Sequence, residues 1–349
     1  MRTRKSGIVQ IAAVYIGTIV GAGFATGREI VQFFSQYGFY GFAGIIMTGY
    51  LFIILGTKIM LLAHSINAQT YQELNNYLFG KKWGIVVNYL FFMMLFGVTA
   101  VMLSGAGAVF EEQLGIPKWV GVFFTIGLAM IILHKGVKGL VGVNMVVVPM
   151  MILFSVVLFV GRLQSPDFQV DLWGIPEEIS YWDAIVSPFL YSAFNLGLAQ
   201  AVLIPLAYEV KDPKIIKGGG IVGGICLTII LLISHVSLLS LPNMMAFDIP
   251  SAELMKSLAE PFYWIFIVVI YGEIFTSLVG NVFGLERQLV RVLNWKSIAI
   301  FAGIFLVVLL ISMVQYRTLL SFLYPIFGYV CLLFLFLLAF KKPKSLPRK

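Results

Sequence analysis

The chain has 349 residues, of which 60% are hydrophobic and only 11% are charged, and its mean hydropathy is +0.96. Soluble domains carry about 25% charged residues, and a soluble protein of this length cannot remove so much apolar surface from water. The composition excludes an ordinary cytosolic enzyme, a disordered chain and a disulfide-rich secreted scaffold. It predicts an all-α membrane protein. The net charge of +8 does not indicate nucleic-acid binding, because the basic residues lie between apolar stretches.

Ten apolar stretches are long enough to cross a bilayer, which requires about 20 residues as a helix. In chain order they cover residues 7–34, 39–63, 83–110, 117–134, 139–161, 183–208, 217–242, 261–285, 296–314 and 318–340. If the N-terminus is cytoplasmic, nearly all Lys and Arg residues of the connecting loops fall on the cytoplasmic side. The exceptions are Lys118, Arg162, Lys256 and Arg317. The positive-inside rule therefore predicts ten transmembrane helices in the cytoplasmic (inner) membrane, with cytoplasmic N- and C-termini.

The longest outer loop, residues 162–182, divides the ten stretches into two groups of five. The first group covers 7–161 and the second covers 183–340. Because five is an odd number, the two halves enter the membrane in opposite orientations, which is the arrangement of an inverted repeat. We expect one transmembrane transporter domain, 1–349, built from a first and a second five-helix repeat.

The first stretch of each half contains residues that interrupt helices. In the first, Gly17–Gly27 reads GTIVGAGFATG, and each glycine costs about 1 kcal/mol of helix propensity relative to alanine. In the sixth, Pro188 is followed by Ser192, Asn195 and Gly197. Paired interruptions at corresponding positions mark the binding site of many transporters, so we predict that both helices are broken at mid-membrane. The alternative is that these glycines allow close helix packing.

The eighth stretch carries an ionisable residue at membrane depth, Glu273, and such residues are candidates for function. Thr276 and Ser277 follow three and four residues later, on the same helical face. One acid and two hydroxyls form a group of hard oxygen ligands, which suits Na⁺. Two alternatives stay open. The hydroxyls bond to their own helix while Glu273 is protonated or hydrogen-bonded to a neighbouring helix, or Glu273 carries a proton.

Arg28, Glu29 and His235 are further ionisable residues within these stretches. Arg28 and Glu29 follow the interruption in the first stretch, and either form part of an outer gate or extend to the membrane surface. His235 is interpreted as a packing residue rather than a proton relay. No catalytic motif occurs, so we predict that the protein is not an enzyme and has no organic cofactor.

The division into five plus five stretches, with the first and sixth interrupted, resembles the LeuT fold of the amino acid–polyamine–organocation (APC) superfamily. The segment GTIVGAGFATGRE is similar to the YkvI-type group of bacterial membrane proteins, which is placed among amino acid permeases. The resemblance implies a secondary active transporter, a symporter that carries an amino acid or similar small zwitterion by alternating access, coupled to sodium.

The resemblance also implies site residues. Sodium would bind the carbonyls of the first and eighth helices and two hydroxyls, at Gly17, Val20, Glu273, Thr276 and Ser277. Substrate would bind at both interruptions, at Ala22, Gly23, Phe24, Ser192, Ala193, Phe194 and Asn195. Relatives that carry amines place an acid near the first interruption, where this chain has Gly21. This difference favours a substrate that brings its own carboxylate.

Two alternatives to sodium symport remain open. One is H⁺-coupled transport through Glu273, and the other is a nutrient-sensing receptor that uses a transporter fold. The partners expected in each case are a small-molecule substrate and the lipid bilayer, and no nucleic acid.

Overall fold

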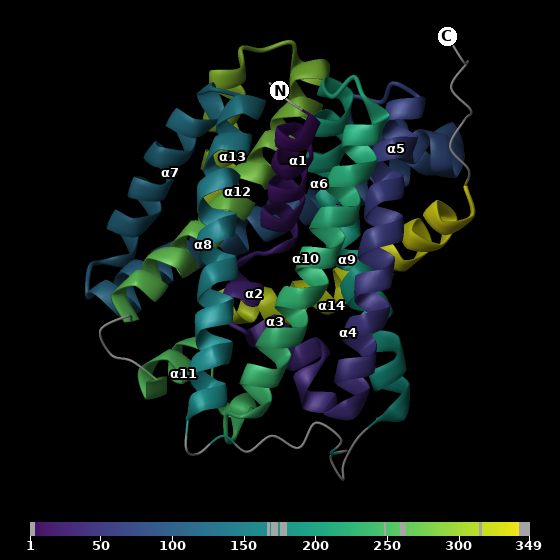
Figure 1. Ribbon diagram of the computed structural model, residues 1–349. Helices are drawn as coiled ribbons and strands as arrows, with labels where there is room; N and C mark the ends of the chain where they lie inside the picture. The colour runs from purple at the N-terminus through teal and green to yellow at the C-terminus, as the bar shows by residue number, and fades with distance from the viewer. Residues whose placement is uncertain are drawn as a thin grey trace.

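The computed structural model describes residues 4–165, 168, 174, 180–247, 249–258, 263–313 and 316–341. Within these residues the chain is helical, with no β-strand. The long helices stand side by side in one bundle, and the shorter helices lie between them or at their ends (Figure 1).

The first half of the chain begins with a divided helix, α1 (Arg4–Ile19), α2 (Ala22–Ala25) and α3 (Arg28–Phe33). After the 3-10 turn η1 (Ser35–Tyr37), the second apolar stretch forms α4 (Phe39–Leu51), the π-helical segment η2 (Phe52–Gly56) and α5 (Thr57–Ser65). The remaining helices of this half are α6 (Tyr71–Leu114), α7 (Lys118–His134) and α8 (Val137–Gln164).

The second half begins with α9 (Tyr181–Glu209) and α10 (Pro213–Leu239). A 3-10 turn, η3 (Met244–Ala246), and the short helix α11 (Pro250–Leu258) lead to the long helix α12 (Tyr263–Leu293). The chain continues through α13 (Ser297–Ile311) and α14 (Tyr316–Phe340). Every predicted apolar stretch therefore forms helical structure. The largest differences are in α6, which extends back to Tyr71 across a non-helical Gly80 (φ +78°), and in α12, which continues to Leu293.

Six continuous helical segments of the described chain are long and apolar enough to cross a membrane. They are Phe39–Ser65, Tyr71–Leu114, Val137–Gln164, Tyr181–Glu209, Pro213–Leu239 and Tyr263–Val290. Shorter apolar helices cover Lys118–His134, Ser297–Ile311 and Phe327–Phe340. The protein is therefore a multi-pass membrane protein, while the total of ten spans and the side on which the termini lie stay predictions.

The predicted interruption of the first helix is confirmed. The amide of Val20 still donates to Ile16 O (2.8 Å), but α1 ends at Ile19 and α2 begins at Ala22. A second irregular position follows at Gly27. Its φ of +79° is a conformation that residues with a side chain rarely adopt. The main chain between α1 and α3 is therefore irregular, and carbonyls at the end of α1 lack helical partners.

The predicted break in the sixth apolar helix is wrong, because α9 is one helix from Tyr181 to Glu209. The polar side chains that suggested a break instead bond to main-chain carbonyls of the same helix. Ser192 Oγ donates to Pro188 O (2.7 Å) and Asn195 Nδ2 donates to Tyr191 O (3.0 Å), in each case four residues back. The Pro188 carbonyl also accepts a bond from the hydroxyl of Thr48 on α4 (3.4 Å).

The divided helix lies at the centre of the bundle. α1 packs against α8, α9, α10 and α12, and α2 packs against α12. The side chains of α9 between Tyr191 and Ala207 are buried. α7 and α13 lie toward one edge (left in Figure 1), away from α4 and α5. The irregular main chain between α1 and α3 is therefore enclosed by α8, α9 and α12.

Candidate functional site

Five oxygen atoms converge where α1 ends against α12. Ser277 Oγ lies 2.6 Å from Val20 O and 3.4 Å from Gly17 O. Thr276 Oγ1 lies 3.4 Å from Gly17 O and 3.0 Å from Glu273 O. The two hydroxyl side chains are only 2% and 6% exposed. The structure therefore brings together all five residues of the predicted sodium site, and we call them the oxygen cluster.

The local geometry of the two helices explains this convergence. On α12, residues three and four positions apart share one face, so Thr276 and Ser277 stand beside the Glu273 carbonyl. On α1, the end of the helix at Ile19 frees the Gly17 and Val20 carbonyls to accept bonds from another helix. Carbonyl and hydroxyl oxygens are ligands for hard cations.

Gly17 also allows α1 to approach α8. A Cβ atom at Gly17 would overlap the side-chain oxygen of Asn144 and crowd Val148. The Asn144 amide nitrogen donates to Leu140 O (2.9 Å), while its Oδ1 is buried without a hydrogen-bond partner in the described structure. An amide oxygen thus lies directly against the main chain of the oxygen cluster.

Glu273 also borders a space that the other four residues of the oxygen cluster do not line. It lines a cavity of about 30 Å³ between α2, α8, α11 and α12, together with Phe24, Ser155 and Ser251. Glu273 is 5% exposed, and its Oε2 has no hydrogen-bond partner among the described residues. Glu273 therefore belongs to the cluster through its main-chain carbonyl and also to the wall of this cavity.

A second cavity, which we call the central cavity, lies beside the helix interruption. It measures about 20 Å³ and is bounded by Gly21, Phe194, Asn195, Ser277 and Asn281, among others. Because Ser277 belongs to both, the central cavity adjoins the oxygen cluster.

The predicted substrate-binding residues are divided among several places. Phe194 and Asn195 line the central cavity, whereas Phe24 lines the cavity of Glu273. Ser192 and Ala193 are fully buried where α9 packs. Gly23 lies against the side chain of Glu29. Ala22 begins α2, and its side chain lies outside the described residues.

Arg28 and Glu29 are adjacent in sequence but point to different places. The Arg28 guanidinium donates to Met245 O (2.9 Å) and Phe247 O (3.1 Å), in the segment around η3. Glu29 is 3% exposed, and its side chain packs over Gly23 and lines the central cavity. Glu29 was not among the predicted binding residues, because the direction of its side chain depends on the positive φ of Gly27.

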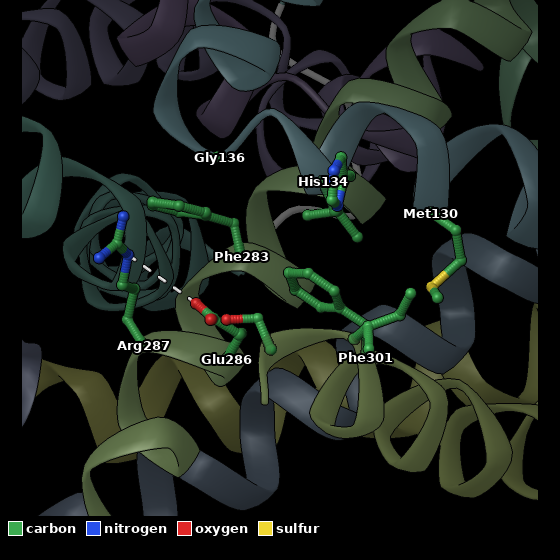
Figure 2. Close-up of a pocket in the computed structure, with 10 residues that line it drawn as sticks. Met130, His134, Gly136, Phe283, Glu286, Arg287 and Phe301 are labelled. Atoms are coloured by element: carbon green, nitrogen blue, oxygen red, sulfur yellow. Dashed lines mark ion pairs between the residues drawn. The ribbon is translucent and has the colours of Figure 1, made fainter. Parts of the chain in front are cut away.

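A larger pocket of about 180 Å³ lies between α7, α12 and α13. Figure 2 shows Glu286 and Arg287 facing each other near Phe283, with His134 and Phe301 across the pocket. Arg287 lies 3.8 Å from Glu286 and 3.7 Å from Glu209 at the end of α9. Its guanidinium also stacks over the Phe283 ring at 4.9 Å. This ion-pair group links α12 to α9 and was not predicted from the sequence.

Comparisons with known proteins identify the fold and the family. The chain is similar to a crystal structure of MhsT in complex with L-phenylalanine, with a TM-score of 0.72 and 17% identity, over 95% of this chain and 88% of that one. It is also similar to a substrate-bound, outward-open structure of a Na⁺-coupled sialic acid symporter, with a TM-score of 0.66 and 12% identity, over 90% and 72% of the two chains. The protein therefore has the LeuT fold of these transporters.

At the level of sequence, the chain is 46% identical to the membrane protein YkvI of Bacillus subtilis (strain 168), over 98% of both chains. The sequence matches no family model. Identity of this extent over nearly the whole length shows that the chain belongs to the YkvI family of membrane proteins.

Proposed function

We propose that the protein is a secondary active transporter that carries an amino acid or similar small zwitterion across the cytoplasmic membrane, coupled to Na⁺. The observation that carries this proposal is the oxygen cluster. Five buried oxygens from two helices converge at the place where the central helix is interrupted. The fold shared with MhsT and with a Na⁺-coupled symporter supports it.

In this proposal Na⁺ binds the carbonyl oxygens of Gly17, Val20 and Glu273 and the hydroxyls of Thr276 and Ser277. The hydroxyls that now donate to the carbonyls would rotate, so that their oxygens face the ion. The ion would then join the end of α1 to α12. Because it interacts with oxygens from both helices, it favours the conformation in which these oxygens converge, and this differential binding is the basis of coupling.

Substrate would bind beside the ion, in the central cavity. A cavity of about 20 Å³ holds roughly one water-sized group, so an amino acid requires the walls to move apart. The resemblance to LeuT-fold transporters places the substrate carboxylate against the main chain of Ala22, Gly23 and Phe24. Since α9 is continuous, it would contribute the side chains of Phe194 and Asn195 rather than free main-chain groups.

Alternating access would use the two five-helix repeats, 7–161 and 183–340, with ten spans and cytoplasmic termini. Contacts between corresponding helices support such a repeat. α1 packs against α9, and both α4 and α5 pack against α10. In the same way, α6 packs against α12 and α7 packs against α13. An axis of pseudo-symmetry between the halves would bring these equivalent helices together, and rocking of one set against the other would expose the central cavity to each side in turn.

The test is uptake of a radiolabelled amino acid mixture into vesicles that contain the purified protein. An inward Na⁺ gradient is expected to drive accumulation, and a K⁺ gradient of equal size is not. Protein-free vesicles provide the background. Uptake equal to this background under both gradients would overturn the proposal.

Proton coupling through Glu273 is the second candidate. The observation that favours it is the buried carboxylate oxygen without a hydrogen-bond partner among the described residues, next to a cavity at the helix interruption. In the same vesicles, accumulation driven by an inward proton gradient without sodium, and abolished in Glu273→Gln, would favour this candidate over sodium coupling.

A further inference from the structure

The pocket of about 180 Å³ between α7, α12 and α13, which we call the edge pocket, joins a buried floor to an exposed mouth. Phe283 and Glu286 in its lining are only 1% and 6% exposed, whereas Ile298 is 59% exposed. α7 ends at His134 and α13 begins at Ser297, and both residues line the pocket. The mouth therefore lies at the ends of two apolar helices, toward the edge of the bundle (left in Figure 1).

The floor of the edge pocket holds a carboxylate and a guanidinium that no hydrogen bond joins. Glu286 Oε2 lies 3.8 Å from Arg287 Nε, and Arg287 lies 3.7 Å from Glu209, both longer than a hydrogen bond (Figure 2). Arg287 Nε is buried without a hydrogen-bond partner in the described part of the chain. Glu286 likewise makes no hydrogen bond with any described residue. One guanidinium thus faces two acids, and both signs of charge keep hydrogen-bonding capacity for a ligand.

The start of α13 adds donors for an anion at the mouth. The first amides of a helix have no partner within the helix, and here they belong to Ser297 and Ile298, which line the edge pocket. These amides and the helix dipole attract negative charge. Arg287 lines the same pocket from α12. An anion bound there would meet positive groups from two helices.

A ligand that carries both an ammonium and a phosphate matches this arrangement. The ammonium offers three donors to the Glu286 carboxylate. The phosphate oxygens accept charge-assisted hydrogen bonds from Arg287. A volume of about 180 Å³ holds several water-sized groups, which is enough for an ammonium and a phosphate on a short linker. Near the mouth, Ile131 and Ile298 are 61% and 59% exposed, so acyl chains attached to the phosphate would find apolar surface.

We propose that the edge pocket binds the headgroup of a phospholipid with a primary ammonium, phosphatidylethanolamine. Glu286 binds the ammonium, Arg287 and the start of α13 bind the phosphate, and the acyl chains lie against α7 and α13. The site is separate from the central cavity and does not depend on which ion or substrate the protein carries. Because Arg287 also pairs with Glu209 at the end of α9, the lipid would act on the ion pair that links α12 to α9.

The experiment measures the melting temperature of the purified full-length protein in detergent with three short-chain phospholipids that share the same acyl chains. Phosphatidylethanolamine has a primary ammonium, phosphatidylcholine has a trimethylammonium without N–H donors, and phosphatidylglycerol has no cation. A ligand that binds the folded state raises the melting temperature. Phosphatidylethanolamine should act at a concentration about 10-fold or more below the other two, because it alone donates hydrogen bonds to Glu286. Soluble O-phosphoethanolamine, which lacks acyl chains, should require a much higher concentration than the lipid.

Two variants test the two ends of the headgroup separately. Glu286→Gln removes the charge that pairs with the ammonium, and should respond equally to phosphatidylethanolamine and phosphatidylcholine. Ser297→Glu places a negative charge beside the phosphate, and should weaken the response to phosphatidylethanolamine about 10-fold or more. It should fold even if Glu286→Gln does not, because Ser297 is exposed and an acid in the first turn of a helix is favourable. The control is Glu253→Gln on α11, an exposed acid paired with Lys256, which should respond as the unmodified protein does.

Equal stabilisation of the unmodified protein by all three phospholipids would overturn the site, since it would show only general contact of lipid with apolar helices. A preference for phosphatidylethanolamine that persists in Glu286→Gln would also overturn it, as would an unchanged response in Ser297→Glu. If O-phosphoethanolamine stabilises the protein at the same concentration as the lipid, the pocket binds a soluble zwitterion and the assignment to a phospholipid fails.

Discussion

The substitution Ser277→Ala removes the side-chain oxygen that lies close to the Gly17 and Val20 carbonyls of the oxygen cluster. Ser277 Oγ lies 2.6 Å from Val20 O and 3.4 Å from Gly17 O. In the absence of sodium, its loss should lower the free energy of unfolding by about 1 kcal/mol, the net value of one buried hydrogen bond. In the presence of sodium, a ligand of the ion is lost as well.

The two effects differ in size. An interaction with a charged group contributes about 1.5–3 kcal/mol. Removing it should therefore lower the affinity for sodium about 10- to 150-fold. At a sodium concentration about 100 times the dissociation constant, binding stabilises the unmodified protein by about 2.7 kcal/mol. In Ser277→Ala the same concentration should add only about 0.3–1.4 kcal/mol. The sodium-specific part of the stability therefore falls by half or more.

The assay compares melting temperatures in NaCl and KCl at equal ionic strength over a range of concentrations. The matched control is Ser237→Ala, because Ser237 is also a buried serine but bonds only within α10, to Ile233 O (2.8 Å). Both variants should lose similar stability in KCl, and only Ser277→Ala should lose its response to sodium. An equal sodium response in Ser277→Ala and Ser237→Ala would refute the cation site.

Three further predictions use the same assay. Glu273→Gln should keep its full sodium response, because Glu273 contacts Thr276 of the cluster through its main-chain carbonyl, and a lost response would show that the carboxylate itself binds the ion. Gly17→Ala should lose about 1–3 kcal/mol of stability, together with its sodium response, because the added methyl overlaps Asn144; normal melting in both salts would contradict this. Arg162→Met should cost about 1.5–3 kcal/mol without changing the sodium response, because Arg162 donates to Ser240 Oγ (2.8 Å) and Ser240 O (2.9 Å). A wild-type melting temperature would refute this role.

The helices themselves are predictable from sequence for a physical reason. In a bilayer the main chain has to satisfy its own hydrogen bonds, so a long apolar stretch forms a helix. The interruption of the first helix was also predictable, because the glycines of Gly17–Gly27 lower helix propensity within a short stretch. The spacing of Thr276 and Ser277 on α12 is local information, so the sequence contains it directly.

The predictions that were wrong or missing depend on contacts that the spacing of residues in the sequence does not specify. Ser192 and Asn195 bond to carbonyls four residues back within the continuous helix α9, although the same residue types also favour breaks. The inward direction of Glu29 results from the φ reversal at Gly27 and the space above Gly23. The cavity that Glu273 lines depends on how α2, α8 and α11 pack beside α12.

The most direct test of sodium-coupled transport is the entry of radioactive sodium into vesicles that contain the purified protein. Adding a mixture of the standard amino acids outside should accelerate sodium entry in the unmodified protein and in Ser237→Ala, and should have little effect in Ser277→Ala. Amino acid uptake without any accompanying sodium entry would contradict the account, since the ion in the oxygen cluster would then play no part in transport.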